Sequence, residues 1–286
     1  MRPSNQRVLG FPCLVCAAAC VLAPTGGATV VRAQELDGFS PAPGKGDVAL
    51  SISFDSYDEF WVGTEKVSVP DLGTVDSNSL SIWWRHGLTE RLALVATLPY
   101  VDVEGDGLAN LSDSGIQDAT VLAQYRLWTR ESGARHSFVV AGGIKTPVGD
   151  YEGDAPISIG DDTTDVLLRA VYLLQSGSFY LSTQVGYDLR SDDAPDGLPL
   201  AITGGWSFGR ATVSATYSRY FADGGTDIGD PGFTFPSNKD EYERIGAKLF
   251  SRFNDSFGWS IAAFTTLDGR NSGDTTGYSA GLVLSY

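Results

Sequence analysis

Cysteine and histidine are scarce in this 286-residue sequence, and their scarcity excludes several kinds of chemistry. The three cysteines all lie within the first 20 residues, so disulfides and thiol catalysis are excluded for the rest of the chain. The two histidines, His86 and His136, are isolated, and the sequence has no zinc-binding spacing, phosphate-binding loop or nucleophile elbow. We therefore expect no catalytic residue, no cofactor and no metal ion, and we predict that the protein is not an enzyme.

Basic residues are also in short supply. The chain has 20 lysines and arginines against 35 aspartates and glutamates, which gives a formal net charge of −15. A chain with this balance repels nucleic acid and anionic lipid surfaces unless it carries a separate basic patch. We therefore expect no nucleic-acid partner.

Long hydrophobic runs are confined to the N-terminus. Arg2 and Arg7 precede an apolar stretch over residues 8–22, and compact residues occupy the positions one and three before Gln34. This order of a basic segment, an apolar segment and a cleavage site is typical of an export signal. We interpret residues 1–33 as a signal peptide that is removed from the mature protein.

Cleavage would remove three arginines and no acid, leaving 17 basic against 35 acidic residues, a net charge of −18. A lipoprotein signal ending at Cys20 is a weaker alternative, because the usual leucine three positions earlier is missing. Residues 34–46, rich in proline and glycine, are expected to form a flexible periplasmic lead-in. No apolar helix of spanning length follows, so residues 47–286 could enter a membrane only as a closed β-barrel.

Segments of alternating polarity fill the rest of the chain. In the last one, Tyr278, Leu282 and Tyr286 share an apolar face, whereas the other face is mostly small and polar. A closing strand with an aromatic C-terminus is typical of outer-membrane β-barrels. Eleven earlier segments have about the same length and alternation. The twelve expected strands are 47–57, 76–86, 92–100, 119–128, 136–146, 165–174, 179–189, 199–208, 211–221, 240–251, 258–267 and 276–286.

The connections between these segments alternate between short and long. Short turns on one side, long loops on the other and an even strand count are the rule for outer-membrane barrels, and they would leave both termini periplasmic. Aromatic residues near strand ends, such as Trp84 and Tyr100, suit the girdles at the two membrane interfaces. The sequence therefore predicts an all-β protein, a transmembrane antiparallel up-and-down β-barrel of about 12 strands in the cell outer membrane. A soluble antiparallel sandwich or barrel is the alternative.

Several short motifs carry a resemblance to a known family. They comprise residues 60–73, 86–92, 98–100, 115–118, 125–127 and 143–149. From Trp61 to the C-terminus, the chain resembles a family of Gram-negative outer-membrane proteins named after the meta-pathway of phenol degradation and described as transporters. The resemblance implies a barrel that passes small hydrophobic or aromatic compounds. The motifs lie mostly at turns and strand ends, so they indicate the fold more than the solute.

Charged residues divide between acidic loops and basic strands. A lysine or arginine facing lipid near the bilayer midplane costs about 2–4 kcal/mol, so charges within the strands are expected to face the lumen. These candidate lumen charges are Arg85, Arg126, Lys145, Arg169, Arg244 and Lys248, opposed by Asp165 and Asp188. Basic residues around a pore favour anions; ordinary filling, with Arg169 near Asp165, is the alternative. Because two aspartates are too few to neutralise six cations, we expect a modest preference for anions such as aromatic carboxylates.

Two functions are compatible with this barrel. One is a channel or transporter for small molecules, and the other is a structural or surface-interaction barrel with a filled, non-conducting lumen. Small inward residues such as Ser79 and Gly281 argue for space, whereas Trp83 and Tyr180 argue for a constriction, and we favour the channel. The expected partners are outer-membrane lipid and lipopolysaccharide, the barrel-assembly machinery through the C-terminal strand, and a small solute.

Overall fold

A computed structural model of the protein describes residues 36–109, 111–151, 153, 155 and 157–286. The expected signal peptide, residues 1–33, lies outside the described residues. Within the described ranges, no helix is long and apolar enough to cross a membrane.

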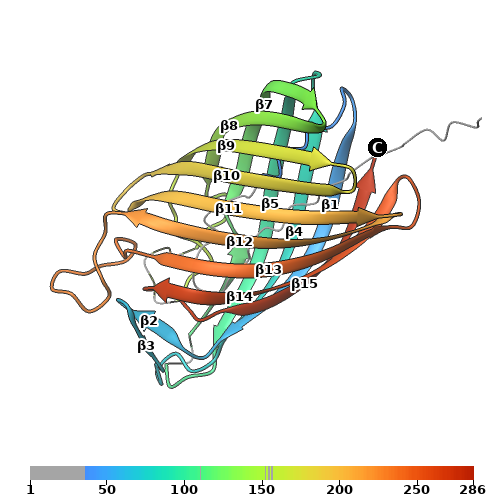
Figure 1. Cartoon of the computed structure of the whole chain (residues 1–286). Coiled ribbons are helices and arrows are strands. Elements are labelled where there is room, and N and C mark those ends of the chain that lie inside the picture. The colour runs from blue at the N-terminus through green and yellow to red at the C-terminus, as the bar shows by residue number, and fades with distance from the viewer. Residues whose placement is uncertain (1–35, 110, 152, 154, 156) are drawn as a thin grey trace, which may run out of the picture.

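Twelve antiparallel strands close into a barrel, which confirms the predicted fold class (Figure 1). Each strand pairs with the next barrel strand along the chain, and the pairing of the first with the last closes the sheet. Closure leaves no unpaired strand edge, so the backbone amides and carbonyls of the wall bond to one another. The barrel strands are β1 (Gly46–Tyr57), β4 (Val75–Gly87), β5 (Leu92–Gly105), β7 (Ala119–Ser132), β8 (Ala134–Thr146), β9 (Asp165–Ser176), β10 (Phe179–Arg190), β11 (Asp196–Phe208), β12 (Ala211–Asp223), β13 (Glu241–Arg252), β14 (Phe257–Arg270) and β15 (Thr276–Ser285).

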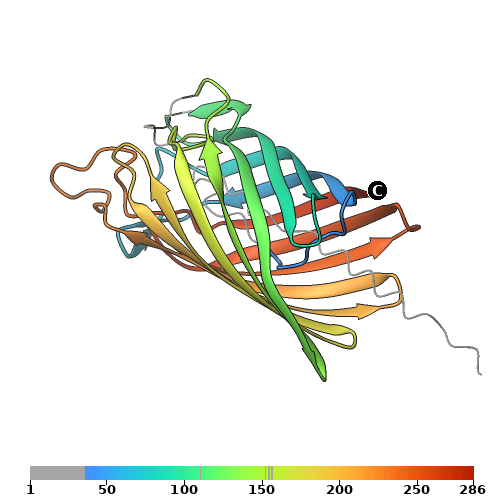
Figure 2. The same ribbon diagram turned by 90° about the horizontal axis from the view of Figure 1, so that it is seen from above.

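The two ends of the barrel differ in their connections. One end, called here the turn end, carries the short turns, the start of β1 and the end of β15. The other, called the loop end, carries the long connections and three short strands, β2 (Phe60–Val62), β3 (Glu65–Val67) and β6 (Ser112–Ile116). The β7–β8 hairpin projects beyond the neighbouring turns in Figure 2.

The two faces of the wall separate apolar from polar side chains. On the outer face, Leu50 pairs with Ile82 on one side and with Leu282 on the other, and each of these side chains is at least 45 % exposed. One position along, Ser51 and Ser81 pair on the inner face, where Ser81 is buried. The alternation predicted from sequence is thus the alternation between the outside and the inside of the barrel.

Pro99 lies inside β5, whereas sequence reasoning expected the strand to end near this proline. On one side of β5, the pairing with β7 ends at Thr97 and the pairing with β6 begins at Tyr100. The Pro99 carbonyl faces this junction and accepts a hydrogen bond from the Gln117 amide at 3.0 Å. Proline has no N–H to donate, and its nitrogen lies where β5 changes its partner from β7 to β6. No hydrogen bond between strands is therefore lost at Pro99, and β5 continues to Gly105.

Several other strands are longer than the alternation predicted. β7 runs to Ser132 instead of residue 128, and β14 runs to Arg270 instead of residue 267. The added residues are polar or exposed on both faces, so they carry no period-2 signal even though their backbone stays paired.

The side chains that β15 exposes on the outer face predict how a charged substitution in this strand affects barrel assembly. We expect Leu282→Arg to reduce assembly strongly, because the 62 % exposed Leu282 side chain lies in the outer apolar belt, where an arginine costs about 2–4 kcal/mol at midplane depth. Ser279→Arg, on the inner face of the same strand, should reduce assembly less. The yield of heat-modifiable protein in membrane fractions measures both, and equal yields would contradict the assignment of the two faces.

Candidate functional site in the barrel interior

The charged residues of the inner wall lie in networks of opposite charge. On β8, the Lys145 ammonium lies 2.7 Å from an Asp165 carboxylate oxygen and 3.5 Å from an Asp118 oxygen. Arg190 continues this network, with its Nε 3.5 Å from Asp165 and a second contact to Asp161. The network joins the strands β8, β9 and β10 on the inside of the barrel.

Arg169 and Asp188 form a second pair next to this network. Arg169 Nη1 donates to Asp188 Oδ1 at 2.5 Å, and both side chains are almost completely buried. Sequence reasoning placed Arg169 near Asp165, whereas the structure gives it Asp188 on the adjacent strand. Arg169 faces Gly186 across the pair of strands, so no side chain separates the guanidinium from the Asp188 region.

Arg85 is held by two carboxylates that the sequence analysis did not count. Its two terminal nitrogens lie 3.1 Å from Asp37 and 3.1 Å from Asp47. With Asp118 as well, three acids join Asp165 and Asp188 as counter-ions of the basic wall. The excess of lumen cations expected from the sequence is correspondingly reduced.

The remaining candidates have different surroundings. The Arg244 guanidinium lies 4.2 Å from the ring centre of Tyr242 and 5.2 Å from that of Phe264. Lys248, also on β13, is buried and lies within electrostatic reach of Asp37. Arg126, on β7, is only partly buried and donates to the backbone carbonyl of Glu90. All eight candidates line the inside of the wall, but they do not converge on one point.

The chain before β1 enters the barrel. The Leu36 amide donates to Gln184 Oε1 at 2.6 Å, and Gln124 Nε2 donates to the Phe39 carbonyl at 2.9 Å. The Phe39 ring meets the Tyr180 ring edge-on, with centroids 5.4 Å apart. Residues 36–40, called here the lumen segment, therefore contact inward-facing side chains from several strands.

Two glycines allow this close packing. Gly38 has a φ of +78°, and a Cβ there would stand 3.0 Å from the Cβ of Leu173. Gly205 lies beneath Tyr180, and a Cβ there would stand 2.1 Å from the tyrosine ring. Any larger residue at Gly205 would displace the ring that supports Phe39.

Most of the residues that hold the lumen segment were not among the candidate residues predicted from the sequence. Gln124 and Gln184 are almost completely buried on the inner face. Their polar side chains at inward positions of two strands were the signal that the sequence offered. Asp37 was overlooked because residues 34–46 were expected to form a flexible lead-in. Burial raises the pKa of the Asp37 carboxyl above its ordinary value, and the Arg85 guanidinium opposes that rise.

At the loop end, the connection between β8 and β9 folds inward. Its Tyr151, Ile157 and Ile159 side chains pack in one apolar cluster with Val101 and Val103 of β5. The Tyr151 hydroxyl donates to Asp118, and burial next to that carboxylate raises the pKa of the tyrosine. This connection therefore narrows the lumen at the loop end, as the lumen segment does nearer the turn end.

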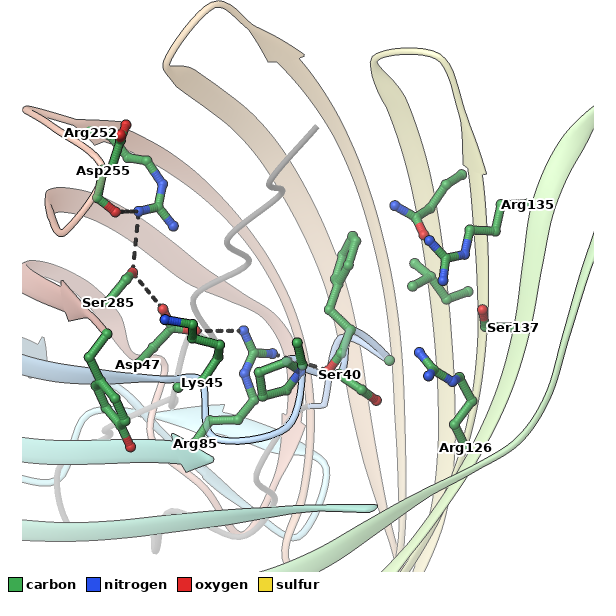
Figure 3. A pocket seen from close by; sticks show the side chains of 18 of the residues that line it. Ser40, Lys45, Asp47, Arg85, Arg126, Arg135, Ser137, Arg252, Asp255 and Ser285 are labelled. Atoms are coloured by element: carbon green, nitrogen blue, oxygen red, sulfur yellow. Dashed lines mark hydrogen bonds and ion pairs between the residues drawn. The ribbon is translucent and has the colours of Figure 1, made fainter. Parts of the chain in front are cut away.

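A cavity of about 660 Å³ lies between the lumen segment and the turn end. Figure 3 shows Arg126 and Arg135 together on one side of it, Arg252 and Asp255 on the other, and Arg85 between them. Its charged lining residues are Lys45, Arg85, Arg126, Arg135 and Arg252 against Asp47 and Asp255. The volume suits a small organic molecule, and positive side chains predominate in the lining.

The Arg169–Asp188 pair generates a prediction about stability. We expect Arg169→Leu to destabilise the barrel by about 3–5 kcal/mol, because it leaves a buried carboxylate without its partner. Arg169→Leu combined with Asp188→Leu should recover most of that loss. Equilibrium unfolding in denaturant, followed by tryptophan fluorescence in lipid vesicles, measures both; a double variant as unstable as the single variant would contradict the pairing.

Comparisons with solved structures support the fold. An outer membrane channel from Pseudomonas putida F1 superposes with a TM-score of 0.74 at 16% sequence identity, over 89% of this chain and 100% of that one. The translocator domain of the autotransporter NalP from Neisseria meningitidis gives a TM-score of 0.49 at 12% identity, over 85% and 88% of the two chains. The first similarity shows a shared fold; the second is too low to carry an argument. No curated protein matches the sequence significantly.

The sequence itself matches a protein family over most of its length. The family is described as "Putative MetA-pathway of phenol degradation", and the match covers residues 62–282. This range includes every barrel strand from β4 to β14 and most of β15 but leaves out β1, and it confirms the resemblance carried by the short motifs. The chain belongs to this family of proteins named for the pathway of phenol degradation.

Proposed function

We propose that the protein is a channel of the cell outer membrane that passes small molecules across that membrane. The observation that carries this proposal is the closed barrel with an apolar outer face and a buried inner face lined by polar and charged residues. Such a wall suits lipid outside and solvent inside. On this proposal residues 1–33 direct export and are cleaved, the turn end faces the periplasm, and the loop end faces the cell exterior.

Polar atoms on the inner wall favour a hydrated lumen over a filled one. Among the described residues, the Ser79 and Ser81 hydroxyls and the Trp83 indole N–H are buried and have no protein partner. A buried polar group without a hydrogen bond costs free energy, so solvent is the partner that suits these groups. The cavity at the turn end adds space of the size that a small solute needs.

The proposed solutes are small aromatic or hydrophobic molecules. Two features support the class: the family description refers to phenol degradation, and apolar side chains such as Phe39 and Tyr180 line the narrow part of the lumen. The Pseudomonas putida protein with the same fold is called an outer membrane channel. Lipid, lipopolysaccharide and the assembly machinery that would recognise β15 are the partners proposed for the outer surface.

The packing at the loop end favours the second candidate function. The inward connection buries Ile157 and Ile159 in an apolar cluster, which fills part of the lumen there. A barrel closed in this way would act through its acidic loops instead of its interior. A measurement of single-channel conductance distinguishes the channel from the closed barrel.

We expect the purified protein to form small channels in planar bilayers, and Asp37→Ala with Phe39→Ala to raise the single-channel conductance. Those two side chains hold the lumen segment through Arg85 and Tyr180, so their loss frees cross-section. Arg130→Ala, an exposed change in the β7–β8 hairpin outside the cavity lining, is the matched control and should leave conductance unchanged. If neither the natural protein nor the double variant conducts, the barrel is closed and the second candidate function holds.

A further inference from the structure

Two arginines in the cavity at the turn end differ from the other cations of the lumen. Arg126 of β7 and Arg135 of β8 both line the cavity, and each lies within electrostatic reach of the other. Arg126 donates a hydrogen bond to the neutral backbone carbonyl of Glu90. Neither guanidinium forms an ion pair within 4 Å among the described residues, although Glu90 lies within electrostatic reach of Arg126 and Glu131 lies opposite Arg135 in the register of β7 and β8.

Two other cations around the cavity, Arg85 and Arg252, are hydrogen-bonded. Arg85 bonds to Asp37 and Asp47, as described above. Arg252 Nη1 donates to the Asp255 carbonyl at 2.8 Å and to the Ser285 hydroxyl at 3.2 Å. Lys45, next to β1, adds a further positive charge to the lining, and the β7–β8 side contributes the two neighbouring guanidinium groups of Arg126 and Arg135.

The two lining carboxylates do not compensate that charge. Both Asp47 oxygens are occupied, one by Arg85 at 3.1 Å and the other by the Ser285 hydroxyl at 2.6 Å. Asp255 is exposed, and it lies on the opposite side of the cavity from Arg126 (Figure 3). An anion placed between Arg126 and Arg135 would therefore meet attraction from both and little repulsion from the two lining carboxylates.

The rest of the lining near the arginines is apolar. Phe39 and Pro41 approach from the chain before β1, and Leu173 approaches from β9. A volume of about 660 Å³ accommodates a single aromatic ring with its substituents. Guanidinium groups bind carboxylates through charge-assisted hydrogen bonds, and the apolar lining suits the remainder of such a ligand.

We propose that this cavity is a binding site for a small organic carboxylate, with Arg126 and Arg135 contacting the carboxylate and Phe39, Pro41 and Leu173 contacting its apolar body. The site deepens the proposed function, because it names the class of solute that would pause at the periplasmic end. Since Phe39 belongs to the lumen segment, a bound carboxylate would touch both the wall and that segment.

The test uses the full mature protein in a nonionic detergent, with benzoate as the probe. Ligand-observed NMR titration should show saturable benzoate binding, with benzyl alcohol, benzylamine and inorganic phosphate each binding more weakly. Arg126→Gln combined with Arg135→Gln should weaken benzoate binding about tenfold or more, because two charge-assisted contacts are removed. Arg130→Gln is the matched control, because Arg130 is exposed on β7 and outside the lining of the cavity.

Each outcome bears on the site. A tenfold loss in the double variant with an unchanged control supports it, and if the double variant fails to show heat-modifiable folding, each single variant should still weaken binding. Equal binding of benzoate and benzyl alcohol, or an unchanged double variant, would overturn the carboxylate site, and equal binding of phosphate would overturn its organic specificity. Binding is measured without a bilayer, so a protein that binds benzoate but does not conduct would refute the channel and keep the site.

Discussion

Closure of the sheet is the constraint on which the rest of this structure depends. The pairing of β1 with β15 removes the last free strand edges, so every barrel strand has hydrogen-bonded neighbours on both sides. Once the sheet is closed, alternate residues must point either outward or inward. The apolar belt and the polar lumen are both consequences of that geometry, acting on a sequence of period 2.

Burial of charge inside the closed wall explains the ion networks. A guanidinium removed from water is costly unless a carboxylate and hydrogen bonds replace the solvent. Arg85, Lys145 and Arg169 each meet at least one aspartate within 3.1 Å. These three cations are therefore neutralised within the wall, whereas Arg126 and Arg135 near the turn end form no ion pair among the described residues.

The lumen segment connects these two features. Asp37 supplies a counter-ion to Arg85 from a stretch of chain that belongs to no strand, and Gln124 and Gln184 bind its backbone. Leu36 also packs in a buried apolar cluster with Trp83, Val139 and Leu167, so polar and apolar contacts together hold the segment inside the barrel. The proposed carboxylate site lies against it, which places ligand binding next to the element that narrows the lumen.

The sequence by itself determined the strands, their number and the assignment of their faces, because alternation at period 2 survives wherever lipid lies on one side and solvent on the other. It did not determine the ends of β7 and β14, where the added residues are polar or exposed, or the extension of β5 beyond Pro99, where proline was expected to end the strand. It also placed the candidate lumen charges on the inner face from parity alone. Only the tertiary structure decided which charge pairs with which, because Arg85 meets Asp37, and Arg169 meets Asp188, through the curvature of the barrel and the entry of the lumen segment.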